Sequence, residues 1–345
     1  MADRQERYQA TLVGCAVGDA LGMPVEGWNR EQIRKYVGKV SGLMAPVIPR
    51  DAGGNALAHD EYGAIKSWTA GLMRGEYTDD TILTLAIAES LVARRGPDLH
   101  DAAQRQLRAF DSRVQPDGHV RGAFGGSTRE AFARLRKGIS PFYSGANGPG
   151  TGPMMKMSPV GLYMDAADAY APGLEFARQI GRMTHLDERS VAGGVVQAHA
   201  VYHALQGVSR EEFIDSLVSV SRIYEEPLRQ DAVAHERGTL TEKLAWIGKN
   251  RDIMPDDAHA YLGSSGLAVE AYPFSLFMLQ KFWDDPVTGL IETVNYGGDC
   301  DTTGAMFGAL AGARHGMVFP REWVEDILNI SGILALGKSM YEMRL

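Results

Sequence analysis

Apolar residues recur at every third or fourth position along most of the chain, the spacing that places them on one face of an α-helix. The alternation of apolar and polar residues that marks a half-buried β-strand is nearly absent. No change of composition divides the chain, and no internal repeat with a period of 20–50 residues is visible. We therefore expect an all-α fold in which residues 1–345 form a single compact multi-helix domain.

The periodic segments predict helices around residues 12–20 and over residues 82–93, 99–111, 128–137, 155–169, 175–183, 188–206, 210–222, 273–282, 303–315 and 323–336. Gly14, Gly18 and Gly22 recur at every fourth position of the first helix. Glycine in a helix interior costs about 1 kcal/mol relative to alanine, so this spacing indicates a buried helix with close backbone packing. Pro273 is expected in the first turn of its helix, where a missing N–H costs nothing.

Three stretches rich in glycine and proline interrupt the helical pattern, at residues 41–73, 116–127 and 140–153. Long segments without regular structure are uncommon in compact domains and are often functional. The chain contains 40 glycines, well above the roughly 7% that is typical of proteins. These loops are therefore the first places to look for a binding site.

Composition narrows the class of protein. The chain has 45% hydrophobic and 23% charged residues, which is typical of a globular protein, and a net charge of −8. With no basic run, binding to nucleic acid is not expected. No stretch of 18 uninterrupted apolar residues suggests a membrane span, and the polar N-terminus does not resemble a secretory signal. Only two cysteines, Cys15 and Cys300, are present, which suits a reducing, cytoplasmic setting.

Two acidic segments, far apart in the sequence, each precede a predicted helix. They are YTDDT at residues 77–81 and GGDCDTT at residues 297–303. Threonine and aspartate are good N-caps, and negative charge near a helix start is favourable by about 0.3–1 kcal/mol. A cap needs one oxygen, however, and each segment supplies at least three. From the residues alone, helix capping and a shared chemical site both remain open.

If the two segments meet, Asp79, Asp80, Asp299 and Asp301 share one pocket. Unpaired carboxylates at such distances repel one another or take up protons. Divalent cations remove this conflict, and carboxylate and hydroxyl oxygens suit Mg²⁺, Mn²⁺ or Ca²⁺ better than zinc. Four carboxylates can bridge two ions about 3.5–4 Å apart.

Five segments, in this order, resemble the ADP-ribosylglycohydrolase family, which includes the dinitrogenase reductase-activating glycohydrolase. They are GCAVGDALGMPVE at 14–26, GEYTDDT at 75–81, MMKMSPVGL at 154–162, TH at 184–185 and GGDCDTTGA at 297–305. The resemblance spans nearly the whole chain, and the second and fifth segments match the family's metal motifs.

The resemblance implies an all-helical fold with two divalent cations, Mg²⁺ or Mn²⁺, as cofactors. The implied metal ligands are Thr78, Asp79, Asp80, Asp299, Asp301 and Thr302. Glu26 matches a mobile acidic residue near the metals, and Glu26, Asp80 and Asp301 are the residues expected to support catalysis. The family hydrolyses the glycosidic bond between ADP-ribose and an acceptor, so the expected partner is an ADP-ribosylated protein or a small ribosylated molecule.

The glycine-rich loops are expected to bind the rest of the substrate, because backbone N–H groups can hold a pyrophosphate that an acidic pocket would repel. The expected substrate-binding residues are Gly125, Gly126, Ser127, Gly150, Thr151, Gly152 and His185. For His185, which follows a predicted helix, capping is the alternative; the resemblance favours substrate contact.

Two positions depart from the family pattern. Ala123 stands where many members have an aspartate, and Lys156 stands where arginine is common, so a point charge replaces a planar fork. These departures keep two alternatives open. One is a hydrolase of a different sugar-linked metabolite or a nucleoside, and the other is a non-catalytic ADP-ribose-binding relative.

Overall fold

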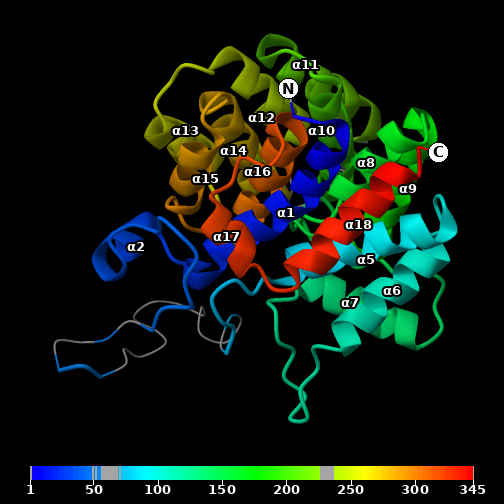
Figure 1. The fold of residues 1–345 in the computed structure, drawn as a ribbon, viewed down its shortest axis with the longest axis horizontal. Helices are drawn as coiled ribbons and strands as arrows, with labels where there is room; N and C mark the ends of the chain where they lie inside the picture. Colours follow the sequence, from blue (N-terminus) through cyan, green and yellow to red (C-terminus); the bar gives the residue numbers. More distant parts are fainter. Residues whose placement is uncertain are drawn as a thin grey trace.

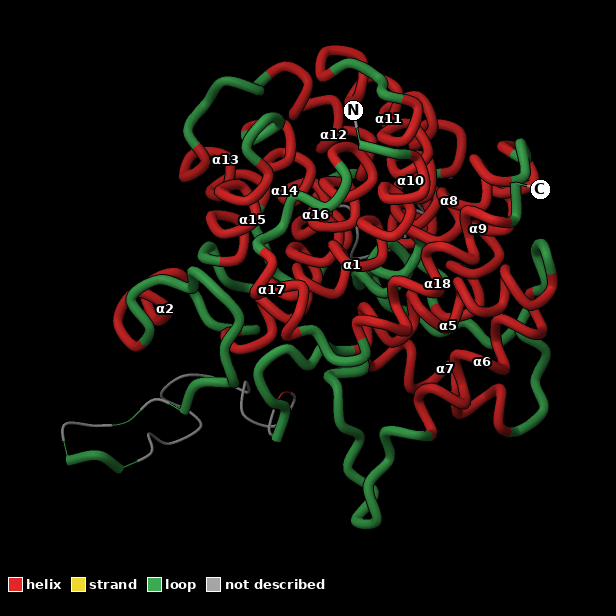
Figure 2. Tube along the Cα trace, in the orientation of Figure 1, coloured by secondary structure: helices red, strands yellow, loops and turns green. Residues whose placement is uncertain are grey.

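The computed structural model describes residues 2–48, 50, 53–55, 69, 71–225 and 237–344. Helices account for most of this part of the chain, and no β-strand occurs in it (Figures 1 and 2). The all-α prediction is therefore confirmed. The predicted loop at 41–73 lies partly outside the described residues.

The helices have the following bounds: α1 Arg4–Gly22, η1 Met23–Val25, α2 Arg30–Tyr36, α5 Asp79–Arg94, α6 Leu99–Asp111, α7 Gly126–Arg136, α8 Ser158–Ala166, α9 Tyr170–Thr184, α10 Glu188–Gln206, α11 Arg210–Tyr224, α12 Leu240–Lys249, α13 Pro255–Leu262, α14 Ala268–Lys281, α15 Pro286–Val294, α16 Cys300–His315, α17 Arg321–Asp326 and α18 Ile330–Glu342.

The predicted helices at 99–111 and 188–206 coincide with α6 and α10. The prediction for Pro273 is wrong, because α14 begins at Ala268 and encloses the proline. The predicted helix at 323–336 is two helices, α17 and α18, separated at Asn329, whose φ of 57° breaks the helical path. Apolar periodicity continues across that break because both helices pack on the same core.

Helices α1 and α16 cross with their backbones in contact, as the glycine spacing predicts. A Cβ atom added to Gly14 would lie 2.1 Å from the carbonyl oxygen of Gly308, and one added to Gly18 would lie 1.9 Å from that of Gly304. Both distances are shorter than any real contact, so side chains are excluded from this crossing. Figure 1 shows α1 in the middle of the assembly, and α16 and α18 both contact it.

One buried apolar cluster extends from Tyr8 on α1 to Met340 on α18. Helix α10 lies within it and contacts α8, α9, α11, α14 and α16. Helices α1 and α18, near the two ends of the chain, are thus packed against the same core.

A hairpin-like loop leaves the helical body between α6 and α7 (Figure 1). Val114 and Val120 form an isolated bridge in it, and the N–H of Gln115 donates to the carbonyl of His119 at 2.7 Å. The base of this loop leads through Ala123 into the N-terminus of α7. Helix α7 begins at Gly126, so the predicted loop at 116–127 ends two residues earlier than expected.

None of the helices described here is both long and apolar enough to cross a membrane.

Candidate metal centre

Asp19 of α1 organises the start of α5. Its side chain is fully buried and accepts hydrogen bonds from the backbone N–H of Thr78 at 2.9 Å and of Thr81 at 3.1 Å. The hydroxyls of Thr78 and Thr81 also donate to it, at 3.0 and 2.6 Å. The first turn of α5 is therefore capped by a residue from another helix. Asp19 belongs to neither acidic motif, and its signal in the sequence is a lone acidic residue within an apolar helical stretch.

The start of α16 is held by a glycine pair. Gly297 and Gly298 have φ values of 75° and 73°, a region that side chains other than glycine rarely adopt. A Cβ added to Gly297 would lie 2.0 Å from the carbonyl oxygen of Trp28, and one added to Gly298 would lie 2.1 Å from that of Ser264. The carbonyl of Ser264 also accepts the N–H of Asp299 at 2.7 Å. Two glycines are needed because two other chain segments approach this turn.

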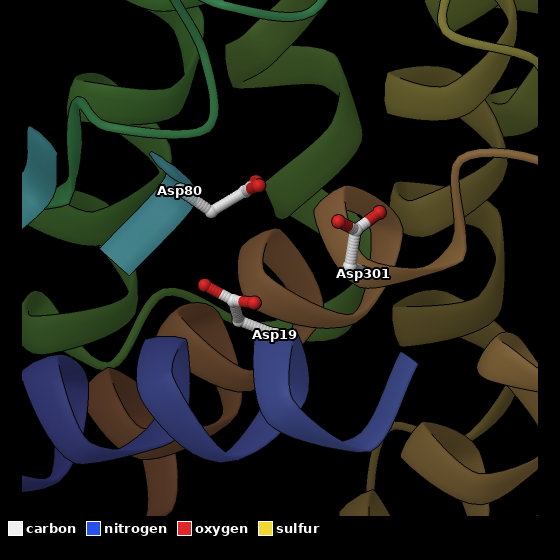
Figure 3. A group of neighbouring side chains, drawn as sticks. All are labelled: Asp19, Asp80 and Asp301. Atoms are coloured by element: carbon white, nitrogen blue, oxygen red, sulfur yellow. The ribbon is translucent and has the colours of Figure 1, made fainter. Parts of the chain in front are cut away.

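These supports bring the acidic residues together. Ligand atoms of Asp19, Asp80 and Asp301 lie within 4.8 Å of one another, and so do those of Glu26, Asp299 and Asp301. Figure 3 shows Asp19, Asp80 and Asp301 pointing toward a common space from α1, α5 and α16. Asp301 belongs to both groups, so the two candidate ligand sets share one carboxylate.

The donors around these carboxylates are unequally distributed. The oxygens of Asp19 accept hydrogen bonds from Thr78 and Thr81, which leaves it better suited to support than to ligation. By contrast, Asp80 Oδ1 and Glu26 Oε2 are buried without any hydrogen-bond partner in the described part of the protein. An unpaired buried carboxylate oxygen is costly, and a cation is the group that would satisfy it.

The hydroxyl of Thr78 reinforces this point. It lies 3.0 Å from carboxylate oxygens of Asp19 and Asp80 and 3.4 Å from Asp301 Oδ2. A hydroxyl carries only one proton, so it can satisfy one of these three carboxylates at a time. The remaining negative charge needs another source of compensation.

Burial raises the pKa of Asp80 and of Asp301 well above the ordinary value, and neighbouring carboxylates raise both further. The pKa of Glu26 is raised in the same way, by burial first and by Asp301 next. The pKa of Asp19 rises only to about 6, because hydrogen bonds from Thr81 and Thr78 offset part of the effect of burial. Bound cations would favour the charged carboxylates and so reverse these shifts.

Capping does not explain the two motifs. The N-cap residues are Thr78 for α5 and Asp299 for α16, and neither side chain makes a capping hydrogen bond to its own helix. Asp301 accepts the N–H of Thr302 at 2.9 Å, which uses one of its two oxygens. The donor set and its unpaired oxygens fit divalent cations.

The two remaining expected ligands, Asp79 and Thr302, line the same cavity, and the carboxylate of Asp79 belongs to neither group of close carboxylates among the described residues. Asp79 Oδ2 accepts a long hydrogen bond of 3.4 Å from the N–H of Gly125. Burial and the charge of Asp19 raise the pKa of Asp79. Asp79 thus connects the acidic wall of the cavity to the start of α7, and its role as a ligand stays a prediction.

The cavity has a volume of about 570 Å³. The acidic residues Glu26, Asp79, Asp80, Asp299 and Asp301 line it, and so do all of the expected substrate-binding residues: Gly125, Gly126, Ser127, Gly150, Thr151, Gly152 and His185. The hydroxyl of Thr151 donates to Asp299 Oδ2 at 2.9 Å, so the two sets of residues are in direct contact. Sequence reasoning therefore selected residues that the fold places around one cavity, although their individual roles stay predictions.

The start of α7 is open toward the cavity. Its N-cap residue, Gly125, has no side chain to bond the first-turn N–H groups, and Gly125, Gly126 and Ser127 all line the cavity. Uncapped N–H groups and the helix dipole favour an anion at this end. Ala123, just before it, also lines the cavity and has a φ of 60°, which is uncommon for a residue with a side chain.

The protein is therefore all-helical, and its cavity joins a candidate metal centre to a site for a small molecule. The chain belongs to the ADP-ribosylglycohydrolase family, whose model matches residues 1–344. Membership of this glycohydrolase family supports hydrolase activity in general terms.

Relatives extend over nearly the whole chain. Mouse and human ADP-ribosylhydrolase ARH3 are each 26% identical to it, over 98% of this chain and 91% and 93% of their own lengths. The uncharacterized protein YegU of Escherichia coli is 27% identical over 91% of this chain and 89% of its own. A solved structure described as an ADP-ribosylglycohydrolase-related protein complex matches with a TM-score of 0.63 at 26% identity and covers all of both chains.

Proposed function

We propose that the protein is a metal-dependent hydrolase that cleaves the glycosidic bond between an ADP-ribosyl or ribosyl group and a protein side chain or small molecule. One observation carries the proposal: a single cavity joins two carboxylate groups that share Asp301 to an uncapped helix start at Gly125–Ser127. The first feature suits cations and a sugar, and the second suits a phosphate. The ARH3 relatives, named as ADP-ribosylhydrolases, support the same substrate class.

Two divalent cations, Mg²⁺ or Mn²⁺, would be held by Thr78, Asp79, Asp80, Asp299, Asp301 and Thr302. When bound, the ions supply positive charge that orients sugar hydroxyls and makes water a better nucleophile. The residues fit this role because their oxygens are hard ligands and two buried oxygens of the cavity wall, on Asp80 and Glu26, lack a hydrogen-bond partner among the described residues.

The chain's own carboxylates serve the bond-breaking step. The anomeric carbon gains positive character as the bond to the acceptor breaks, and the negative wall formed by Asp80 and Asp301 stabilises that charge. Glu26 reaches the wall from the turn after η1, where Gly27 N–H donates to the carbonyl of Gly298 at 2.7 Å. Glu26 has one oxygen without a hydrogen-bond partner among the described residues, and one of its oxygens lies within 4.8 Å of ligand atoms of Asp299 and Asp301. We infer that it exchanges a proton with water or with the departing acceptor.

Next to the acidic wall, the glycine-rich part of the cavity lining would hold the anionic part of the substrate. The first-turn N–H groups of α7 and the backbone at Gly150–Gly152 would bind a pyrophosphate, which the acidic wall repels. The two parts of the lining would thus bind a sugar end and a phosphate end of the substrate.

Ala123 favours a second candidate, a hydrolase of another sugar-linked metabolite or a nucleoside. Its methyl group lines the cavity where many family members carry an aspartate, so substrate orientation at this point would differ.

Both free cysteines are buried, and we expect a cytoplasmic protein.

Hydrolysis assays with Mg²⁺ or Mn²⁺ test these proposals. The substrates are ADP-ribosyl-arginine, an ADP-ribosyl-serine peptide and simple N-ribosides, and the control is the double variant Asp80→Asn, Asp301→Asn. Release of ADP-ribose by the wild type and none by the variant supports the first candidate. Turnover of simple ribosides alone supports the second, and binding of ADP-ribose in calorimetry without turnover of any substrate indicates a non-catalytic relative. Equal turnover by the variant removes the assigned site.

A further inference from the structure

Behind the cavity lies a buried chain of three polar side chains, Lys156, Thr184 and His185. Lys156 Nζ is 3.2 Å from Thr184 Oγ1, and Thr184 Oγ1 is 3.0 Å from His185 Nδ1. Lys156 and Thr184 are fully buried, whereas His185 lines the cavity. The chain therefore connects a buried amino group to a side chain at the ligand site.

The backbone holds this chain rigidly. The N–H of Ala146 donates to the carbonyl of Thr184 at 3.2 Å, and the N–H of His185 donates to that of Gly181 at 2.9 Å. The ring of His185 packs on Gly152, where an added Cβ would lie 2.4 Å from Cε1 and 3.0 Å from Nε2. Its Nδ1 atom therefore faces Thr184, and its Nε2 edge faces the 150–152 loop and the cavity. Within the described residues, no protein hydrogen bond ends on Nε2.

The distances give this chain a direction. A lysine ammonium only donates, so Thr184 accepts from Lys156 and has one proton to give. Gly181 O is 3.4 Å from the hydroxyl, beyond the usual O–H···O range, and it already accepts the N–H of His185. His185 Nδ1 at 3.0 Å is the better acceptor. If Thr184 donates a hydrogen bond to Nδ1, that nitrogen is the acceptor and carries no proton. The single ring proton of the neutral imidazole is then on Nε2.

We propose that Lys156 is a positioning residue that acts through Thr184 to hold His185 in the Nε2–H tautomer, so that the ring presents an uncharged N–H donor to an oxygen atom of the bound ligand. This goes beyond the assignment of His185 as a substrate contact, because it states which atom donates and which buried residue decides it. The identity of the ligand oxygen, on phosphate or ribose, rests on the proposed function; the tautomer does not.

The charge state of the ring agrees with the geometry. Burial, followed by the charge of Lys156, lowers the pKa of His185 to about 3, which keeps the ring neutral at physiological pH. Burial also lowers the pKa of Lys156 to about 7. A neutral amine also has a lone pair that can accept a proton, so it is the ammonium form of Lys156 that fixes Thr184 as the acceptor.

Nitrogen NMR of the protein labelled at its nine histidines tests the tautomer directly. The His185 signals are assigned by their absence from His185→Asn. We expect the wild type to show an unprotonated Nδ1 and a protonated Nε2. In Lys156→Met and Thr184→Val this preference is lost, whereas Thr184→Ser, which keeps the hydroxyl, retains it. Lys249→Met, at an exposed position on α12, serves as the control and leaves the signals unchanged.

A protonated Nδ1 in the wild type, or an unchanged His185 in both Lys156→Met and Thr184→Val, overturns the proposal. Should Lys156→Met fail to fold, Thr184→Val against Thr184→Ser decides the question. The functional consequence is measured with the substrate that the wild type turns over: KM rises about two- to tenfold in Lys156→Met with little change in kcat, as expected for one weakened hydrogen bond. A tautomer that behaves as stated in a protein that turns over no riboside contradicts the proposed function and leaves this inference standing.

Discussion

Asp19 accepts the backbone N–H of Thr78 at 2.9 Å, although 59 positions separate the two residues in the sequence. This contact joins the first helix to the start of α5 and turns Thr78 toward Asp80 and Asp301. An acidic residue that belongs to neither expected metal motif therefore determines how one of those motifs is presented.

Replacing Asp19 is expected to destabilise the protein. Asp19→Ala leaves the N–H groups of Thr78 and Thr81 without their acceptor in a buried site, which should lower the free energy of unfolding by about 2–4 kcal/mol. Chemical denaturation with chelator present measures the loss without a contribution from cations. Asp3→Ala, at an exposed residue whose side chain makes no cap hydrogen bond, should change the stability little. Equal effects of the two substitutions would contradict the supporting role of Asp19.

The close crossing of α1 and α16 predicts intolerance to a single methyl group. In Gly18→Ala the new Cβ would meet the carbonyl oxygen of Gly304 at 1.9 Å, so the helices must separate. We expect a loss of about 3 kcal/mol or more. Gly248→Ala on α12 is the matched control, because its nearest neighbour would be a side-chain atom 3.6 Å away and alanine favours a helix. The Tm should fall in Gly18→Ala and should stay the same or rise in Gly248→Ala.

Adding Mg²⁺ or Mn²⁺ should stabilise the folded protein, because ions that bind only the native state shift the unfolding equilibrium. At a concentration of 100 times Kd the gain is about 2.7 kcal/mol. The double variant Asp80→Asn, Asp301→Asn should lose this response, while Asp117→Asn, in the exposed loop before α7, should keep it. A rise in Tm that is the same in all three proteins would place the ions elsewhere.

Without cations, stability should fall as the pH rises. Asp80 and Asp301 have a raised pKa in the folded protein, so the folded state binds more protons than the unfolded chain. Their stabilisation is present below the unfolded pKa of about 4 and is lost as the pH rises through the folded values. The pKa of Asp19, raised to about 6, adds a loss between about pH 4 and 6.

The depressed pKa of His185, about 3, acts in the opposite sense, because its stabilisation is lost as the pH falls below about 6.5. Comparison with the double variant Asp80→Asn, Asp301→Asn removes this shared contribution. Relative to the variant, the metal-free wild type should become less stable as the pH increases from 4 to 8. A stability difference between the two proteins that is constant over this range would show that neither burial nor the neighbouring carboxylates raise the pKa of Asp80 and Asp301 in the folded protein.

The local features were predictable because their signals lie within a few residues of one another. The periodicity at 99–111 and 188–206 predicted α6 and α10, and the glycine spacing at residues 14–22 predicted a close helix crossing. Short helices were missed even where a start signal existed. Helix α15 begins at Pro286 after Asp285, whose side chain accepts the N–H of Thr288, but its nine residues carry too little periodicity to stand out.

Other features had no local signal. Nothing near Asn329 shows that α17 and α18 are separate, because the apolar pattern follows the common core across the break. Likewise, nothing near Lys156 shows that it reaches Thr184, 28 positions away, and thereby the ring of His185.

The sequence by itself determined the helical class, the two acidic motifs and the glycines that surround them, since each depends on residue type and spacing along a short stretch of chain. Only the tertiary structure decided that Glu26, Asp80 and Asp301 line one cavity, and that residues at the start of α7 line it too. The physical reason is that these distances depend on how closely α1 and α16 cross and how the 297–298 turn packs on two other segments, which are properties of contacts between distant parts of the chain.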